Sequence, residues 1–239
     1  MRRFFANINN NQVIFSKDTL SHIKVIRLNK GENIEVCYLG DVYICQVTNI
    51  NPFDVKIIEK ISDQNNRELS ANLVLFCPLL KRDNFELVLQ KAVELGVKHI
   101  VPYISSRVIK RVTKQEFEQK RERFEKIILN ASEQSNRSYI PKLDNLYNLE
   151  ELVELYKDSS NKFIAYEDAS IKGDLINLDS KIDDIVIVIG PEGGFASKEV
   201  DMFINNNYKV VSLGKRILRA ETACIYSLSV VSYLIENNK

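Results

Sequence analysis

The sequence predicts an α/β protein in which a small β-rich domain is followed by a larger domain of alternating strands and helices. Three observations support this fold class. Residues 33–61 consist mainly of β-branched runs, residues 62–70 contain a single apolar side chain, and from residue 72 onward short apolar runs alternate with segments of helical spacing. Such alternation is typical of a mostly parallel sheet covered by helices. We therefore predict two domains, residues 1–68 and 69–239.

The first domain is expected to be a small β-barrel. One short helical segment should precede its main strands, with Asp18 as N-cap and with Leu20, Ile23 and Ile26 at helical spacing. Gly40-Asp41 forms a turn between two of these strands. The expected strands are 33–39, 42–50 and 54–61. The polar stretch 62–70 then serves as the linker.

The second domain should contain five strands and five helices in near-regular alternation. The helix after the first strand has an apolar stripe that ends at Gly96, a residue type that commonly terminates helices. The expected strands are 72–79, 99–104, 162–166, 184–190 and 208–213. The expected helices are 82–96, 114–135, 148–157, one from about Ser197, which can serve as its N-cap, and a final one that reaches Asn237.

Composition limits the possible functions. The chain has 239 residues, of which 45% are hydrophobic, so it can bury a sizeable core. Lys and Arg number 33 against 32 Asp and Glu, which excludes a wholly basic binding module and a disordered acidic chain. A nucleic-acid partner must therefore be bound through local basic patches.

The cysteines and the hydropathy pattern indicate a soluble, cytoplasmic protein without a metal. There is no C-x-x-C pair and there are only two histidines, so we expect no zinc site. The four cysteines are read as reduced core thiols: Cys37, Cys45, Cys77 and Cys224. No signal peptide is evident, and no apolar stretch reaches the roughly 18 residues of a membrane span.

A glycine cluster marks the first candidate site. Four of the eight glycines lie between 190 and 214, and Gly-Pro-Glu-Gly-Gly (190–194) follows a buried strand of the parallel type. Ligands of open α/β sheets bind at this end of the strands, although a tight turn with a proline would give the same pattern. The segment lacks the dinucleotide and P-loop glycine patterns. Because Pro191 removes one N–H donor, the loop suits an uncharged or zwitterionic ligand.

A second candidate segment is SLGKRILRAETA (212–223). Gly214 follows a strand, a basic stretch comes next, and Glu221-Thr222 opens a helix. Helix capping and surface charge would also explain Arg219 and Glu221. Two glycine-containing loops after neighbouring strands would nevertheless face the same crevice.

These segments resemble a known family. IGPEGGFASKEVD and LGKRILRAETA are similar to the two signature segments of the SPOUT class of S-adenosylmethionine-dependent RNA methyltransferases, and within it to the ribosomal RNA small subunit methyltransferase E (RsmE) family. HIKVIRLNKGE (22–32), KRDNFELVLQKAVELGV (81–97) and EQSNR followed by IP (133–141) also agree. The family's L-R-x-E-T-A motif is intact, whereas Lys215-Arg216 replaces the usual Pro or Glu before its arginine.

The resemblance implies a fold and a set of ligands. It implies a PUA-like RNA-binding barrel, a catalytic domain with a C-terminal trefoil knot, and a homodimer that acts on 16S rRNA in the small ribosomal subunit. The implied cofactor is S-adenosylmethionine, with no metal. By position, the donor-binding residues would be Ile189, Gly190, Gly194, Leu213, Gly214, Ile217, Leu218, Thr222 and Ala223.

The implied reaction is methylation of uracil N3, which needs help to lose its proton. We expect Arg219 to stabilise the developing charge on the uracil oxygen and Glu192 or Glu221 to orient the base or relay its proton. The target uridine must be unpaired or splayed out, because N3 lies on the pairing edge.

RNA contacts are expected from basic and matched segments. Residues 1–30 carry six basic side chains against Asp18 alone, and phosphate contacts require such local patches. The candidate RNA-binding residues are Arg2, Arg3, Lys24, Arg27, Arg82, Lys91, Glu133, Gln134 and Arg137. For Lys91, simple solvation on the polar side of its helix is an equal alternative.

Two other functions fit parts of the sequence. A SPOUT ribose 2′-O-methyltransferase would share the donor loops, but the N-terminal barrel and the 81–97 segment argue against it. A non-catalytic RNA-binding ribosome-assembly factor would not need the intact Gly-Pro-Glu-Gly-Gly and Leu-Arg-Ala-Glu-Thr motifs.

Overall fold

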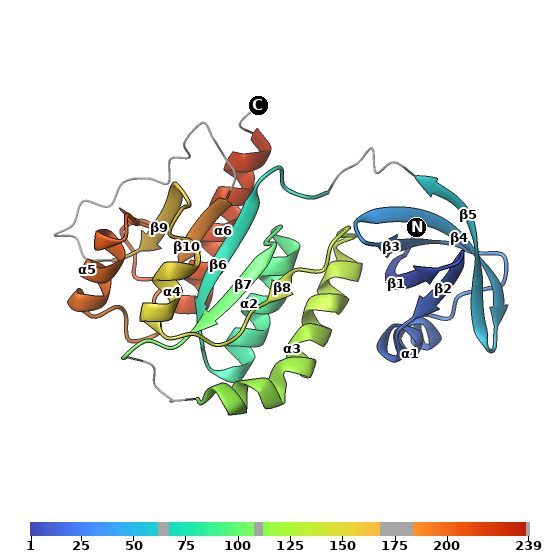
Figure 1. Cartoon of the computed structure of the whole chain (residues 1–239), viewed down its shortest axis with the longest axis horizontal. Coiled ribbons are helices and arrows are strands. Elements are labelled where there is room, and N and C mark those ends of the chain that lie inside the picture. The colour runs from blue at the N-terminus through green and yellow to red at the C-terminus, as the bar shows by residue number, and fades with distance from the viewer. Residues whose placement is uncertain (62–66, 108–111, 168–183, 238–239) are drawn as a thin grey trace. The chain divides into compact units, whose positions relative to one another are not determined.

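The structure, a computed structural model, describes residues 1–61, 67–107, 112–167 and 184–237 (Figure 1). Part of the expected linker, 62–66, lies outside these residues. The chain forms two compact units. The N-terminal unit comprises residues 1–68 and 129–140, and the C-terminal unit comprises residues 69–128 and 141–239. The sequence pattern did not predict that residues 129–140 pack with the first unit.

The N-terminal unit is built on a five-stranded curled sheet. Its strands are β1 (Arg3–Asn9), β2 (Gln12–Phe15), β3 (Asn33–Tyr38), β4 (Asp41–Ile50) and β5 (Phe53–Ile61), in the order β2-β1-β3-β4-β5. The β1–β3 pair is parallel and the other pairs are antiparallel. The Phe15 and Phe53 rings, from the two edge strands, meet with centroids 5.5 Å apart. The sheet therefore curls until its edges approach each other.

Two features of this unit differ from the sequence prediction. Strands β1 and β2 were not expected, and they form a hairpin through Asn10 and Asn11, whose positive φ angles of 47° and 62° suit a tight turn. Helix α1 (Lys17–Ile26) is capped by Ser16, whose hydroxyl accepts a hydrogen bond from the Thr19 N–H at 3.0 Å. The expectation that Asp18 caps this helix was wrong, because Asp18 lies within the first turn.

The C-terminal unit contains an entirely parallel six-stranded sheet with the order β11-β9-β10-β6-β7-β8. Its strands are β6 (Asn72–Pro78), β7 (His99–Tyr103), β8 (Lys142–Leu143), β9 (Asn161–Ala165), β10 (Asp184–Val188) and β11 (Lys209–Val211). The helices along this part of the chain are α2 (Arg82–Glu94), α3 (Lys114–Gln134), α4 (Leu149–Leu155), α5 (Ser197–Asn205) and α6 (Ala220–Asn237). The α/β prediction is confirmed, and only the two-residue β8 was missed.

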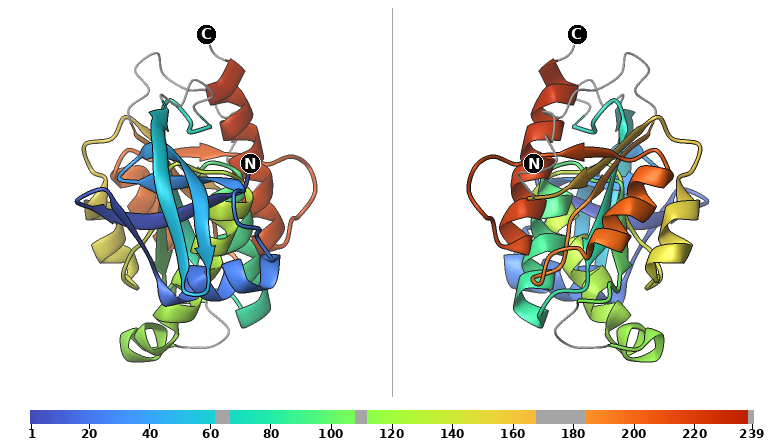
Figure 2. Two further views of the ribbon diagram at one scale, coloured as in Figure 1. Left: turned by 90° about the vertical axis from the view of Figure 1, so that its right-hand side faces the viewer. Right: turned by 90° about the vertical axis from the view of Figure 1, so that its left-hand side faces the viewer.

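Helices cover both faces of this sheet (Figure 2). On one face, α4 and α5 pack on β6, β7, β9 and β10 through Leu152, Phe203 and their neighbours. On the other face lie α2 and α6, which pack against each other. The aromatic ring of Phe85 in α2 contacts those of Phe117 and Phe124 in α3. Enclosure on both faces explains why β10 reads as an uninterrupted apolar run.

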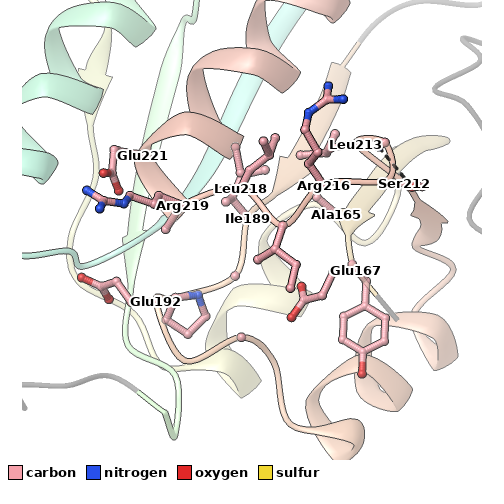
Figure 3. A pocket seen from close by; sticks show the side chains of 18 of the residues that line it. Ala165, Glu167, Ile189, Glu192, Ser212, Leu213, Arg216, Leu218, Arg219 and Glu221 are labelled. Atoms are coloured by element: carbon pink, nitrogen blue, oxygen red, sulfur yellow. Dashed lines mark hydrogen bonds between the residues drawn. The ribbon is translucent and has the colours of Figure 1, made fainter. Parts of the chain in front are cut away.

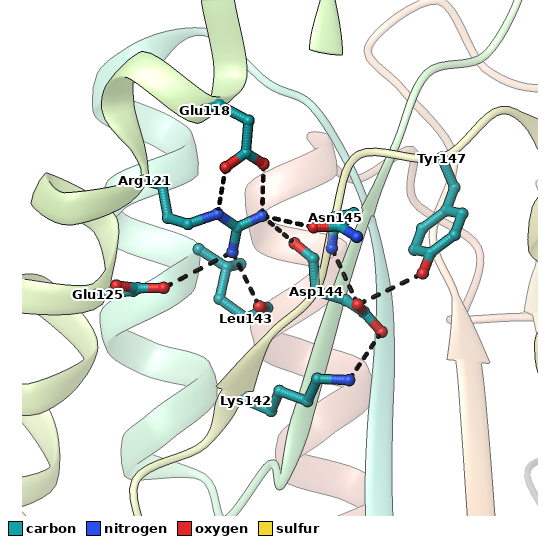
Figure 4. A network of polar contacts seen from close by, with 8 residues as sticks. All are labelled: Glu118, Arg121, Glu125, Lys142, Leu143, Asp144, Asn145 and Tyr147. Carbon is teal, nitrogen blue, oxygen red and sulfur yellow. Dashed lines mark hydrogen bonds and ion pairs between the residues drawn. The ribbon is translucent and has the colours of Figure 1, made fainter. Parts of the chain in front are cut away.

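A polar network in the C-terminal unit joins α3 to the segment after β8 (Figure 4). The Arg121 guanidinium donates to the Leu143 carbonyl at 3.1 Å and to the Asn145 side-chain oxygen at 3.0 Å, and it pairs with Glu118 at 2.6 Å. Asp144 follows in the chain and accepts from the Asn145 N–H at 3.0 Å. One guanidinium of α3 therefore binds several oxygen atoms at the end of β8 and in the segment that follows it.

Among the described residues, none of the helices has the length and apolar character needed to cross a lipid bilayer.

Stability should fall in mild acid because of His99. Burial lowers the pKa of this imidazole, and the nearby Asp144, 2.8 Å from Nε2, opposes that shift only in part. The unfolded chain therefore takes up a proton near pH 6.5, where folded His99 does not. The contribution of neutral His99 to the free energy of unfolding should therefore be complete above this pH. We expect the free energy of unfolding to decrease as the pH falls from about 7 to 5. Urea titrations of the wild type and His99→Gln across this range provide the measurement. An equally steep acid loss in the variant would contradict this assignment.

Candidate active site

A cavity of about 540 Å³ lies at the carboxyl ends of the parallel strands of the C-terminal unit. Its walls come from the segments that follow β9, β10 and β11 and from the starts of α2 and α6 (Figure 3). Because the strands are parallel and adjacent, their carboxyl ends reach the same edge of the sheet. Segments that are distant in the sequence therefore meet here.

Most of the residues expected to bind a cofactor line this cavity. They are Ile189, Gly190, Gly194, Leu213, Gly214, Ile217, Leu218 and Ala223. Thr222 is not among the lining residues, and it is exposed on α6. Arg219, Glu192 and Glu221, the expected catalytic residues, also line the cavity. The structure thus brings the two signature segments together at one site.

Two glycines permit the loops to take this path. Gly194 has a φ of +66°, and a Cβ there would lie 2.9 Å from a carboxylate oxygen of Glu167. Gly214 has a φ of +110°. Residues other than glycine rarely adopt such positive φ angles, so both loops depend on glycine.

The cavity combines an apolar floor with charged margins. Ile189 is buried, whereas Ile217 is 86% exposed although it is apolar. In Figure 3, Arg219 lies with Glu192 and Glu221 at one side of the cavity, and Glu167 and Arg216 lie at the other. Such a site suits a ligand with an apolar body and charged or polar ends.

Glu192 is oriented by the start of α2. One of its carboxylate oxygens accepts from the Lys81 backbone N–H at 3.4 Å. Lys81 is the N-cap of α2, and its side chain makes no capping hydrogen bond. A carboxylate at this position interacts favourably with the helix dipole.

A second contact set supports the glycine loop from outside the cavity. Glu199 in α5 accepts from the Ser106 N–H and hydroxyl, both at 2.9 Å, and from the Ala196 N–H at 2.8 Å. Arg107 donates to the Phe195 carbonyl at 3.3 Å. The N-cap of α5 is Ala196, so the expectation that Ser197 caps this helix was wrong.

Sequence reasoning missed part of the lining. The missed residues include Lys81, Asn84, Ala165, Tyr166, Glu167 and Ser212. Glu167 follows β9, which pairs with both β10 and β11. A strand order that placed β9 between them would have predicted this residue.

Several candidate RNA-binding residues are exposed in the N-terminal unit. Arg2, Lys24 and Arg27 are exposed, and Arg2 donates to the Ile26 carbonyl at 3.1 Å, which places it at the end of α1. Gln134, in the same unit, is also exposed. Lys91, in the C-terminal unit, pairs with Glu94 at 2.9 Å, in agreement with the alternative of a solvated pair. The side chain of Arg82 lies outside the described residues.

Three other candidates are buried and paired. Arg3 is 4% exposed and pairs with Glu35 at 2.7 Å. Arg137 is 2% exposed and pairs with Glu68 at 2.6 Å. Glu133, also buried, contacts His22 Nδ1 at 3.0 Å, and burial raises the pKa of its carboxyl. All three side chains are buried and paired within the N-terminal unit, an environment that favours a structural role, and their contact with RNA stays a prediction.

Within the described part of the chain, no group of three or more His, Cys, Asp or Glu side chains could hold a metal ion.

The fold and the cavity correspond to a class of RNA-modifying enzymes. The family model described as RNA methyltransferase domain matches residues 67–232. Two proteins named ribosomal RNA small subunit methyltransferase E are similar over nearly the whole chain. The one from Mesomycoplasma hyopneumoniae is 37% identical, covering 96% of this chain and 98% of that protein, and the one from Bacillus subtilis is 29% identical, covering 99% and 98%.

A solved structure agrees with these relatives. Ribosomal RNA small subunit methyltransferase E from Neisseria gonorrhoeae, bound to S-adenosyl methionine, has a TM-score of 0.86 and 28% identity over 98% of each chain. The present chain therefore belongs to the ribosomal RNA small subunit methyltransferase E family.

Replacement of Arg137 tests its structural role. Arg137→Ala would leave the Glu68 carboxylate buried without its cation, so we expect the free energy of unfolding to fall by about 3–5 kcal/mol. Lys24→Ala, which removes an exposed cation of the same unit, should change it by less than about 0.5 kcal/mol. Chemical denaturation of the three proteins measures both effects. A change at Arg137 as small as that at Lys24 would contradict a structural role for the Arg137–Glu68 pair.

Proposed function

We propose that this protein transfers a methyl group from S-adenosylmethionine to N3 of a uridine in the 16S rRNA of the small ribosomal subunit. The observation that carries the proposal is the single cavity formed by Gly-Pro-Glu-Gly-Gly and Leu-Arg-Ala-Glu-Thr, with Arg219 and two carboxylates at its margin. Membership of the ribosomal RNA small subunit methyltransferase E family supports the substrate class.

The cavity suits the methyl donor. S-adenosylmethionine has an adenine ring with apolar faces, a ribose with two hydroxyl groups, a cationic sulfur and a zwitterionic tail, and when bound it supplies an activated methyl group. Ile189, Leu213 and Leu218 would contact the adenine and the ribose, while Gly190, Gly194 and Gly214 let the backbone approach them closely. Ile217 and Ala223 complete the apolar lining. A similar putative methyltransferase from Legionella pneumophila was solved with this compound, with a TM-score of 0.87 and 26% identity over 98% of this chain.

The charged margin would activate the uracil. Loss of the N3 proton leaves negative charge on the flanking carbonyl oxygens, and a guanidinium stabilises such charge. The position of Arg219 at the border of the cavity, beside Glu192 and Glu221, supports this role. One of these carboxylates would accept the N3 proton or orient the base. Glu192 is held by the Lys81 N–H, so its position is the more fixed of the two.

The N-terminal unit would bind the RNA backbone. Arg2, Lys24 and Arg27 are exposed cations near the carboxyl end of α1, and Lys30 follows on the next turn of chain. Contacts of this kind orient an RNA without reading its sequence. The curled five-stranded sheet is consistent with a PUA-like barrel. A C-terminal trefoil knot, a homodimer and a cytoplasmic location complete the proposal.

The activity can be tested by mass mapping of methylated RNA. Small ribosomal subunits from cells that lack the protein, incubated with it and S-adenosylmethionine, should gain 3-methyluridine. Arg219→Ala should reduce the rate by about 10²- to 10³-fold while the donor still binds, because the guanidinium acts on the developing charge. Lys114→Ala removes a distant exposed cation paired with Glu151 and should retain the wild-type rate.

Other outcomes would favour other functions. A ribose-methylated product would indicate the 2′-O-methyltransferase alternative. Absence of any heat of S-adenosylmethionine binding in calorimetry would indicate a non-catalytic assembly factor.

RNA affinity should depend on the cations at the end of α1. We expect Lys24→Ala combined with Arg27→Ala to weaken binding of a small-subunit RNA fragment and to reduce the slope of log affinity against log salt by about 1.4, the value for two lost phosphate contacts. Filter binding between 50 and 200 mM salt gives this slope. Lys56→Ala, an exposed change on β5, is the matched control. An unchanged slope in the double variant would exclude α1 from the RNA interface.

A further inference from the structure

The carbonyl group of Ile189 lies at a break in the sheet. Ile189 follows the last residue of β10, and its N–H donates to the Phe76 carbonyl of β6 at 3.2 Å. The register of β10 and β6 pairs Val188 with Phe76, so Ile189 lies opposite Cys77. In a parallel ladder, the Ile189 carbonyl would next accept from the N–H of residue 78. Residue 78 is proline, which has no N–H to donate.

The Tyr103 side chain supplies the missing donor. Tyr103 is the last residue of β7, and it pairs with Pro78 in the register of β6 and β7. Its hydroxyl donates to the Ile189 carbonyl, in a contact that spans the strand containing Pro78. The side chain is fully buried. Burial also raises the pKa of the Tyr103 hydroxyl well above its usual value, so the group keeps its proton and remains a donor.

The contact lies directly beneath the proposed donor site. Ile189 and the next residues, Gly190 and Pro191, line the cavity. Ile189 and Gly190 are among the positions through which the backbone would contact S-adenosylmethionine. A buried carbonyl without a donor would turn toward any available polar group, and the following loop would move with it.

We propose that Tyr103 is a positioning residue for the methyl-donor pocket, because its hydroxyl replaces the backbone donor that Pro78 lacks and thereby fixes Ile189 and the loop after it. The inference rests on the proposed function and adds a residue that has no contact with the cavity. It requires Tyr103 to affect donor binding more than the chemical step.

Tyr103→Phe isolates the hydroxyl, since the ring that fills the core is retained. Calorimetric titration with S-adenosylmethionine and with S-adenosylhomocysteine should show affinity reduced roughly tenfold in this variant. At saturating donor, the methylation rate should stay within about twofold of the wild type. Tyr208→Phe is the matched control, because the Tyr208 hydroxyl is buried without a hydrogen-bond partner among the described residues. Its donor affinity should equal that of the wild type.

A second substitution provides a rescue that a general structural defect would not show. Pro78→Ala restores a backbone N–H opposite the Ile189 carbonyl. In the Tyr103→Phe background it should recover most of the lost donor affinity, whereas alone it should change affinity little. Unchanged affinity in Tyr103→Phe, or failure of Pro78→Ala to rescue a folded double variant, would overturn the inference. If the wild type itself binds neither compound, the proposed function fails, and that result is distinct from either of these.

Discussion

The active-site geometry depends on one constraint, the enclosure of a parallel sheet on both faces. Strand β10 is buried along nearly its whole length and pairs with β6 on one side and β9 on the other. Helices α4 and α5 cover one face, and α2 and α6 lie on the other. Strands held in this way cannot shift individually, so the loops at their carboxyl ends keep fixed relative positions. The cavity can therefore be formed largely by backbone and small apolar side chains, with few charged groups at its margin.

The surroundings of each charged side chain, and not the number of charges in the chain, distinguish the cavity from the rest of the protein. Arg219 is one of 33 cations in a nearly neutral chain. It borders the cavity together with Glu192 and Glu221, whereas Arg137 is enclosed by Glu68 in the other unit. Two arginines from segments matched to the same family thus lie in different surroundings, one at the border of the cavity and one in a buried ion pair.

The sequence predicted the regular elements well and the long-range contacts poorly. Runs rich in β-branched residues marked β3 to β5. Uninterrupted apolar runs marked the central strands β6 and β10, because burial on two faces requires them. Strand β1 was missed since its Asn residues interrupt the pattern, and β8 is too short to have one. The glycine loops indicated the site, because glycine has a recognisable backbone purpose. Glu167 and Tyr103 gave no comparable signal. The place of Glu167 at the cavity depends on the strand order, and the contact of Tyr103 with Ile189 depends on the strand pairing that brings Pro78 between them.

The discontinuity of the N-terminal unit affects the order in which it can form during synthesis. Its five strands are complete once residue 61 has been made. Two partners appear much later, because Glu68 pairs with Arg137 and Arg3 donates to the Asn136 carbonyl. A nascent chain that emerges from the ribosome can therefore curl its first sheet early but cannot neutralise Glu68 until more than half of the polypeptide has been translated. The N-terminal unit therefore reaches its final state only after residues 69–128 of the C-terminal unit have been made.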